Sequence, residues 1–366
     1  SYTINPGKPK IPIIKKTYTF PKFTEIEKIL CTPINKEQIK LNQPIELTPD
    51  FQSITGNKIL TNNKNSPNQQ TYPTKWYDSH LGAGISKSGE HVVYLSLSIH
   101  PIQYNTKQES ITFVSDFNIE IKYNFPTRNE KHFFFFLIHE LVIITPAEYK
   151  STLNSFVNHK QETGLSPLVK TTTEIKSEYP GRDEQEKIKY FIKDAIETHN
   201  TKYVLLIGNI IQLPIRKTDA YPWENYHGSG ILTDLYYADV YDSSFSFSSW
   251  DTNNNNVFGE VTFDSFPPSP ENIIDEVDLY PDVHIGRIPC SNIEELTIVL
   301  SKIITYEQVT AYQNWFQKII LAGGDTFPLT KGSPFNVFEG EITNVKVGQQ
   351  IPAFEQKRLW TSEKTL

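Results

Sequence analysis

Five apolar residues follow one another in the run Tyr203-Val204-Leu205-Leu206-Ile207, and Gly208 ends it. A short apolar run closed by a turn residue is typical of a strand that is buried on both faces. Four further runs share this character, at residues 141–144, 167–169, 283–285 and 319–322. Helical patterns follow these runs, and the alternation predicts a parallel sheet with helices on both sides, which is the doubly wound α/β class.

Helix signals lie between the apolar runs. Thr145 is expected to cap a helix that has Pro146 in its first turn and reaches about Glu162. A second helix is expected to open at residues 180–183, and a third to cover residues 292–308. The second helix has apolar residues at the i, i+3, i+4 spacing of one buried face, namely Ile188, Phe191, Ile192 and Ile196.

The first 130 residues have a different pattern. Residues 92–98 and 111–123 alternate apolar and polar side chains and are rich in β-branched and aromatic types. Such alternation indicates strands with one buried face. A small antiparallel β-sandwich over residues 1–130 is the expected fold of this part, ahead of the α/β lobe.

Composition excludes several classes of protein. The longest apolar stretch, residues 133–144, is interrupted by His139 and Glu140, so we expect no membrane-spanning helix. Two cysteines are too few for a disulfide framework or a thiolate zinc site. The net charge of -7 and the pI of about 5.8 argue against nucleic acid as a partner.

The long insert between the third and fourth apolar runs carries a candidate calcium loop at residues 251–260. Calcium prefers six to eight oxygen ligands, and alternate side chains here carry oxygen. The expected ligands are Asp251, Asn253, Asn255, the Val257 carbonyl and Glu260. Asn256 stands where a helix-loop-helix calcium loop has glycine, which is tolerable because Asn accepts left-handed backbone. Two charged ligands predict modest affinity, suited to extracellular calcium. The alternative is a polar turn that binds no ion.

Three more carboxylates follow in the same insert, at Asp234, Asp239 and Asp242. Two of them lie among tyrosines that could supply hydrogen bonds. A structural role is therefore expected for this group, with a second ion site or a solvated surface as alternatives.

A cysteine–histidine nucleophile is the main catalytic alternative. Cys290 follows a predicted strand end, and His227 lies in a Gly- and Ser-rich loop of the insert. We expect Cys290 to be a buried residue at a helix start and His227 to be a loop histidine. Cys31 is expected to be a small apolar residue of a sandwich strand.

Several phrases, in this order, resemble the gingipain-type cysteine peptidases of the caspase-like superfamily. They are Val142-Ile143-Ile144-Thr145-Pro146, Ser177-Glu178-Tyr179-Pro180-Gly181-Arg182-Asp183, Tyr203-Val204-Leu205-Leu206-Ile207-Gly208, Thr233-Asp234-Leu235-Tyr236-Tyr237-Ala238-Asp239 and Ile285-Gly286-Arg287-Ile288-Pro289. Upstream, residues 100–105 between two strands are similar to the β-sandwich propeptide of that family. The resemblance implies a propeptide-like domain over residues 1–130, a first α/β subdomain over 131–312 and the beginning of the catalytic subdomain over 313–366.

The resemblance also implies a function. It implies a secreted or cell-surface endopeptidase that cleaves protein or peptide substrates with a Cys nucleophile and a His base. The Gly-His-Gly turn and the strand-end Cys of the family have no matching position here, so no catalytic residue is assigned and the Cys/His dyad is expected outside this segment. The loop at residues 251–260 resembles a calcium loop of related sequences. Asn209 replaces the acid that usually follows the third strand. The alternative is a non-catalytic extracellular surface or assembly protein, acting through self-assembly on a degenerate peptidase scaffold.

Charge divides the chain at the predicted domain junction. Residues 1–130 contain 15 basic and 11 acidic residues, and residues 131–366 contain 20 basic and 31 acidic residues. The net charges are therefore +4 and -11, and opposite charges favour association. We expect the N-terminal sandwich to pack on the acidic lobe as an inhibitory or chaperoning prodomain.

Overall fold

Strand β10 (Tyr203–Ile207) lies inside a four-stranded parallel sheet. The strand order is β13-β10-β8-β9, with β8 at Leu141–Thr145, β9 at Pro167–Thr171 and β13 at His284–Ile288. Val204 faces Val142 on one side and Ile285 on the other. All five residues of β8 are buried. The prediction of a parallel sheet is confirmed for these four runs, whereas the fifth, residues 319–322, pairs in parallel with residues 355–360 in a separate two-stranded sheet.

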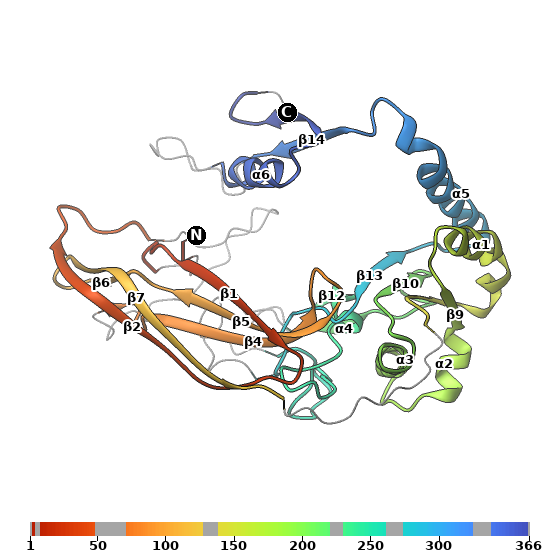
Figure 1. Cartoon of the computed structure of the whole chain (residues 1–366), viewed down its shortest axis with the longest axis horizontal. Coiled ribbons are helices and arrows are strands. Elements are labelled where there is room, and N and C mark those ends of the chain that lie inside the picture. The colour runs from red at the N-terminus through yellow and green to blue at the C-terminus, as the bar shows by residue number, and fades with distance from the viewer. Residues whose placement is uncertain are drawn as a thin grey trace. The chain divides into compact units, whose positions relative to one another are not determined.

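The computed structural model describes residues 2–3, 8–47, 71–126, 138–219, 230–260, 274–324 and 338–364 (Figure 1). The chain divides into two compact units, residues 1–293 and 294–366. His227 and the tetraphenylalanine stretch at residues 133–136 lie outside the described residues. Among the described residues, no helix combines the length and the apolar character needed to cross a bilayer.

Helix α3 (Glu184–His199) supplies the main helical face of the lobe core. Its predicted apolar positions are all buried, from Ile192 at 0% exposure to Ile196 at 8%. They pack in one cluster with Val142 and Leu206 of the sheet. Asp183 caps the helix by accepting a hydrogen bond from the Glu186 amide at 2.8 Å, so the helix start was predicted correctly.

The first helical segment after β8 differs from the prediction. It starts as a 3-10 helix, η1 (Ala147–Leu153), and continues as α1 (Asn154–Glu162). The N-cap is Pro146 and not Thr145. Thr145 remains in strand β8, fully buried, and its hydroxyl has no hydrogen-bond partner among the described residues. The expectation that Thr145 caps the helix was wrong because the strand keeps this residue in extended pairing.

Helix α2 (Thr172–Glu178) was not predicted. Its start is a capping box, in which the Thr171 hydroxyl accepts from the Glu174 amide and the Glu174 carboxylate accepts from the Thr171 amide at 2.7 Å. The lobe also contains β11 (Arg216–Thr218), β12 (Ile231–Thr233) and α4 (Leu235–Ala238).

Two antiparallel sheets form the part that we call the N-terminal β-region, residues 8–126. One sheet has the order β1-β5-β4 and the other β2-β7-β6-β3. The bounds are β1 Ile14–Pro21, β2 Glu25–Lys40, β3 Thr71–Tyr72, β4 Tyr77–Ile85, β5 His91–Ile99, β6 Ile102–Asn105 and β7 Ser110–Asn124. Cys31 of β2 packs with Leu95 and Leu97 of β5, so the two sheets share a buried core. The strands predicted at residues 92–98 and 111–123 are confirmed.

The second unit contains a parallel pair of strands joined by a helix. Strand β14 (Lys318–Gly323) pairs in parallel with β15 (Glu355–Trp360), and α6 (Glu339–Gln350) lies between them in sequence and beside β14 in Figure 1. Helix α5 (Ile293–Val309) and the 3-10 turn η4 (Thr310–Tyr312) precede this motif. A Cβ on Gly323 would lie 2.7 Å from the Gly340 carbonyl carbon, so glycine permits the close approach of helix and strand.

Candidate functional site

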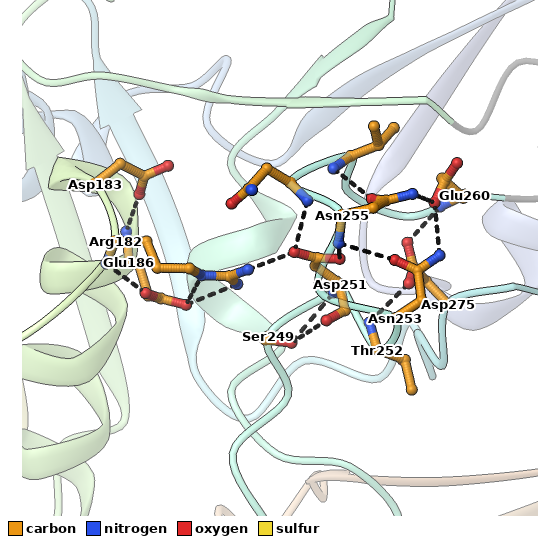
Figure 2. A network of polar contacts seen from close by, with 12 residues as sticks. Arg182, Asp183, Glu186, Ser249, Asp251, Thr252, Asn253, Asn255, Glu260 and Asp275 are labelled. Atoms are coloured by element: carbon orange, nitrogen blue, oxygen red, sulfur yellow. Dashed lines mark hydrogen bonds and ion pairs between the residues drawn. The ribbon is translucent and has the colours of Figure 1, made fainter.

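The predicted calcium loop is built around the carboxylate of Asp251. This residue is only 1% exposed. Its Oδ1 accepts a hydrogen bond from the Asn255 amide at 2.9 Å, and its Oδ2 accepts from the Asn256 amide at 3.1 Å. Arg182 Nη1 donates to the same Oδ2 (Figure 2). Asp251, the first predicted ligand, is therefore already paired with the guanidinium of Arg182.

The other predicted side chains converge beside Asp251. The Asn253 Oδ1 atom accepts from the Asn255 amide at 3.0 Å, and Asn255 Oδ1 accepts from the Val257 amide at 2.8 Å. Glu260 Oε2 accepts from both side-chain amides, at 3.1 Å from Asn253 and 2.6 Å from Asn255. The structure thus brings together the four side chains that were predicted from the sequence, those of Asp251, Asn253, Asn255 and Glu260 (Figure 2). Val257 joins them through its amide, whereas the predicted ligand was its carbonyl.

Left-handed backbone lets the loop turn back on itself. Asn254 has φ of 60° and Asn256 has φ of 65°. Asparagine is among the few non-glycine residues that adopt this conformation readily. The prediction that Asn256 replaces glycine in left-handed backbone is confirmed.

Ion pairs connect the loop to the start of helix α3, because Arg182 binds both Asp251 and Glu186. Arg182 binds Glu186 through Nη2 at 2.8 Å, and Arg216 forms a bidentate pair with Asp183 at 2.7 and 2.9 Å. Burial opposes ionisation of Asp183, but the hydrogen bonds from Arg216 hold its pKa below the ordinary value. The Arg216 guanidinium also lies 3.7 Å from the centroid of the Phe258 ring. Sequence analysis did not connect Arg182 or Arg216 with the loop.

Asp275 closes the other side of the loop and was also missed. Its Oδ1 accepts from the Thr252 amide at 2.7 Å and its Oδ2 from the Glu260 amide at 2.8 Å. Asp275 is 1% exposed, and burial raises its pKa. Both carboxylate oxygens thus fix the two ends of the loop.

The donor chemistry of the loop fits a hard cation in part. Carboxylate and amide oxygens are the ligand types that calcium prefers, and they converge here from alternate residues. Arg182 supplies positive charge to Asp251, and the Asn253 and Asn255 amide nitrogens face Glu260. Among the described residues, no group of three or more His, Cys, Asp or Glu side chains is arranged as a metal site.

The two cysteines are buried. Cys31 is 5% exposed in strand β2, and burial raises the pKa of its thiol. Cys290 is 4% exposed, and its backbone carbonyl accepts from the Asn209 amide at 3.0 Å. A buried thiol is poorly placed to attack a peptide, which supports the rejection of Cys290 as the nucleophile.

Polar groups at the carboxyl ends of the strands bind one another. Arg287 at the end of β13 makes two hydrogen bonds of 2.7 Å to the Asp234 carboxylate and donates to the carbonyls of Gly208 and Leu213. This network ties the insert to the sheet, and it is consistent with the expected structural role of Asp234.

Asn209 occupies the position where the resemblance implies an acid. Its Oδ1 accepts from the amides of Ile211 at 2.9 Å and Gln212 at 3.2 Å. Its Nδ2 donates to Ser291 Oγ at 3.3 Å. The side chain therefore stabilises the turn after β10, a task that an aspartate oxygen could also perform.

The two other acids of the insert are structural as well. Asp239 is fully buried and accepts from the Leu279 amide, and Asp242 Oδ1 accepts from the Ser244 and Ser246 amides. The donors to these carboxylates are backbone amides and not tyrosine hydroxyls, and Tyr237 donates to the Pro214 carbonyl instead. These contacts are consistent with the expected structural role, whereas the expected tyrosine donors were wrong.

Comparison with known proteins identifies the family to which the chain belongs. The sequence model of peptidase family C25 matches residues 137–366. Gingipain R2 of Porphyromonas gingivalis (strain ATCC BAA-308 / W83) is 23% identical over 192 residues, which make up 51% of this chain and 20% of that protein. The chain thus spans a fifth of the length of this relative.

Two solved structures match part of this chain at low sequence identity. The complex of Porphyromonas gingivalis RgpB pro- and mature domains is 20% identical with a TM-score of 0.38, covering 60% of this chain and 42% of that chain. The Arg-specific cysteine proteinase gingipain R (RgpB) is 17% identical with a TM-score of 0.37, covering 60% and 41%. The family match alone extends over more than half of the sequence. The chain therefore belongs to peptidase family C25.

Proposed function

We propose that this chain is the N-terminal portion of a secreted, calcium-stabilised cysteine endopeptidase. In this proposal the N-terminal β-region is a β-sandwich prodomain, residues 131–312 are a doubly wound first subdomain, and the Cys/His dyad lies outside the sequence given. The observation that carries the proposal is the C25 match over residues 137–366. The burial of Cys290 supports placing the nucleophile elsewhere.

The catalytic part is tested with an electrophilic peptide that alkylates active-site thiols. We expect this chain to remain unlabelled, and Cys290→Ser to change nothing, because the thiol is 4% exposed. We expect the product of the longer gene to be labelled and to cleave peptides. Labelling of Cys290 in this chain would refute the proposal. A longer product that neither reacts nor cleaves would favour a non-catalytic surface or assembly protein.

Calcium is proposed to bind the loop at residues 251–260. Asp251, Asn253, Asn255, the Val257 carbonyl and Glu260 would hold it, and the ion would add positive charge beside the loop's two carboxylates. The convergence of Asp251 Oδ1 and Asn253 Oδ1 on the Asn255 amide supports this placement, since both oxygens lie within 3.0 Å of one nitrogen.

Thermal unfolding with calcium and with chelator tests the site. Calcium at about 100 times its dissociation constant should stabilise the chain by roughly 2.7 kcal/mol. Glu260→Gln should remove that response, whereas Glu120→Gln on strand β7 should keep it, because Glu120 lies outside the loop. If calcium does not change the melting temperature of the wild type, the proposed calcium site is refuted.

A further inference from the structure

The N-terminal β-region contacts the lobe along residues 278–282. The Ile85 amide donates to the Pro281 carbonyl at 2.8 Å, and the Ala83 amide donates to Asp278 Oδ2 at 2.8 Å. Strand β4 is an edge of its sheet, so the lobe segment covers backbone groups that would otherwise be unpaired. Ala83 is fully buried and belongs to the lobe core cluster.

Tyr280 fixes the fit of the two parts. Its ring stacks on Tyr94 with centroids 4.7 Å apart, and its hydroxyl lies 2.6 Å from Ser96 Oγ. A Cβ on Gly82 would lie 2.2 Å from Tyr280 Cδ2, so the ring uses space that only glycine leaves. We call this contact between the β-region and residues 278–282 the junction. The name includes the buried lobe carboxylates at this contact, Asp239, Asp278 and Asp282.

The lobe side of the junction buries more carboxylates than ammonium groups. Asp239 and Asp282 are 0% exposed and Asp278 is 8% exposed. Two ammonium groups face them, those of the fully buried Lys189 and of Lys22. Other titratable or charged groups around these are His80, His91, Lys193, Glu197, Arg216, Tyr241, Asp242 and Tyr280. Glu197 pairs with Lys193 at 2.7 Å and Arg216 pairs with Asp183, so one buried carboxylate remains in excess.

Geometry singles out Asp282, because this carboxylate faces an unpartnered histidine nitrogen of the β-region. Its Oδ2 accepts from the amides of Val240 at 2.7 Å and Tyr241 at 2.8 Å. Its Oδ1 has no hydrogen-bond partner among the described residues, and His91 Nε2 of the β-region, 3.8 Å away, likewise has none. Asp278, by contrast, accepts amide hydrogens at both oxygens. Asp239 Oδ1 also lacks a hydrogen-bond partner among the described residues, but Asp239 is the carboxylate that acts most strongly on the Lys189 ammonium group.

We propose that the N-terminal β-region docks on the lobe with uptake of one proton, held between Asp282 Oδ1 and His91 Nε2, and that it undocks as the pH rises. An ionised, unpaired oxygen in this buried place would be costly, and the proton removes that cost. Undocking would expose both groups to water. The inference rests on the contacts of the junction and not on the assignment of peptidase activity.

The pKa values of the pair set the direction of the effect. Burial raises the pKa of Asp282 well above 3.8, and burial lowers the pKa of His91 from 6.5 to about 4. Above pH 6.5 the undocked pair would therefore have lost the proton that the docked pair keeps. Docking should weaken about tenfold per pH unit from there until the docked Asp282 itself ionises. Between pH 3.8 and 6.5 this pair holds one proton in both states, on His91 when undocked, so the pair adds no pH dependence there. Burial also raises the pKa of Asp278 to about 8, and the Asp278→Asn variant removes that separate contribution.

Hydrogen exchange of the Ala83 and Ile85 amides in the intact chain measures docking directly. Between about pH 7 and about pH 9, after correction for intrinsic exchange, we expect protection to fall about tenfold per pH unit. Amides of the β1–β5 pairing, such as Leu97, are internal controls because they lie within one sheet. Asp282→Asn keeps an acceptor for Val240 and Tyr241 and should abolish the slope. Asp278→Asn should retain it.

Each outcome decides the proposal. A slope that survives Asp282→Asn, or one that vanishes only with Asp278→Asn, would place the proton elsewhere and overturn it. Because Asp282→Asn could fail to fold, infrared spectroscopy of the wild-type chain with isotope-labelled aspartate gives a second measurement. A neutral carboxyl band at neutral pH that disappears as protection falls supports the proposal, and the lack of any such band refutes it.

Discussion

Arg182 donates a hydrogen bond to the buried Asp251 carboxylate, although the two residues are 69 positions apart. A guanidinium therefore stands beside the first residue of the candidate calcium loop. Its side chain is 32% exposed, whereas that of Asp251 is fully buried. The loop can thus fold around a charge that the protein itself provides, and an added calcium ion would share Asp251 with that charge.

Removal of this guanidinium should destabilise the lobe. Arg182→Gln leaves the buried Asp251 uncompensated, which should cost about 3 kcal/mol of unfolding free energy in chelator. Lys176→Gln is a matched control, because Lys176 pairs with Glu184 at 2.6 Å but both side chains are about half exposed. The control should cost less than about 1 kcal/mol in denaturant titrations. If calcium binds the loop, it should recover more stability in Arg182→Gln than in wild type. Equal losses in the two variants would contradict the importance of the ion pair.

Arg216 should not tolerate lysine. Arg216 is 4% exposed, and its guanidinium binds both oxygens of Asp183 and lies over the Phe258 ring. Lysine keeps the charge but loses the bidentate geometry, so Arg216→Lys should lower the unfolding free energy by about 2 kcal/mol. Denaturant unfolding measures this, with the exposed Arg358→Lys as control. An unchanged midpoint for Arg216→Lys would show that charge alone is sufficient.

The capping box of α2 should make a measurable contribution. Thr171→Ala removes the hydroxyl that accepts from the Glu174 amide and should cost about 1 kcal/mol. Thr171→Ser retains the hydroxyl and should cost clearly less. Thermal unfolding of the three proteins checks this order, and equal melting temperatures would argue against the cap.

Glu174 should contribute to acid unfolding. Hydrogen bonds from the Thr171 amide, then from Lys150 and the Thr171 hydroxyl, lower the pKa of Glu174 from 4.5 to about 2. The folded state thus binds this proton less tightly than the unfolded state. The resulting stability is present above pH 4.5 and is lost as the pH falls toward about 2. Glu174→Gln should flatten the stability profile in that window alone, and an unaltered profile would refute the prediction.

Asn209 tests whether the departure from the gingipain-like pattern matters for folding. Asn209→Asp keeps the oxygen that accepts from Ile211 and Gln212, so its unfolding free energy should stay within about 0.5 kcal/mol of wild type. Asn209→Ala removes the acceptor and should cost about 1 kcal/mol. Chemical denaturation distinguishes the two, and a larger loss for Asp than for Ala would assign the side-chain nitrogen the main role.

The parallel strands could be predicted because burial on both faces leaves a continuous apolar run in the sequence. Strand β10 has the predicted bounds, Tyr203–Ile207. Helix α2 was missed because Ile175 is its only large apolar residue, so no helical period is visible. The Thr171 and Glu174 spacing was the signal available, since a Thr followed three residues later by Glu is a capping-box pattern.

The candidate site was predictable only as far as it is local. Alternate oxygen side chains from Asp251 to Asn255 stand in the sequence, and so does the asparagine that accepts left-handed backbone. The residues that surround the loop, Arg182, Asp275 and Arg216, come from distant positions in the sequence. Only the folded chain brings them together. No period or motif in one sequence reports contacts between such distant positions.

The space left by Gly82 for the Tyr280 ring makes two segments almost two hundred residues apart dependent on each other. A change at either position that enlarges one side must be matched by a smaller group on the other, so these sites should covary among relatives that keep the contact. A lobe produced without its N-terminal partner would leave an aromatic ring and a group of acids facing solvent, which predicts poor solubility for such a truncated protein.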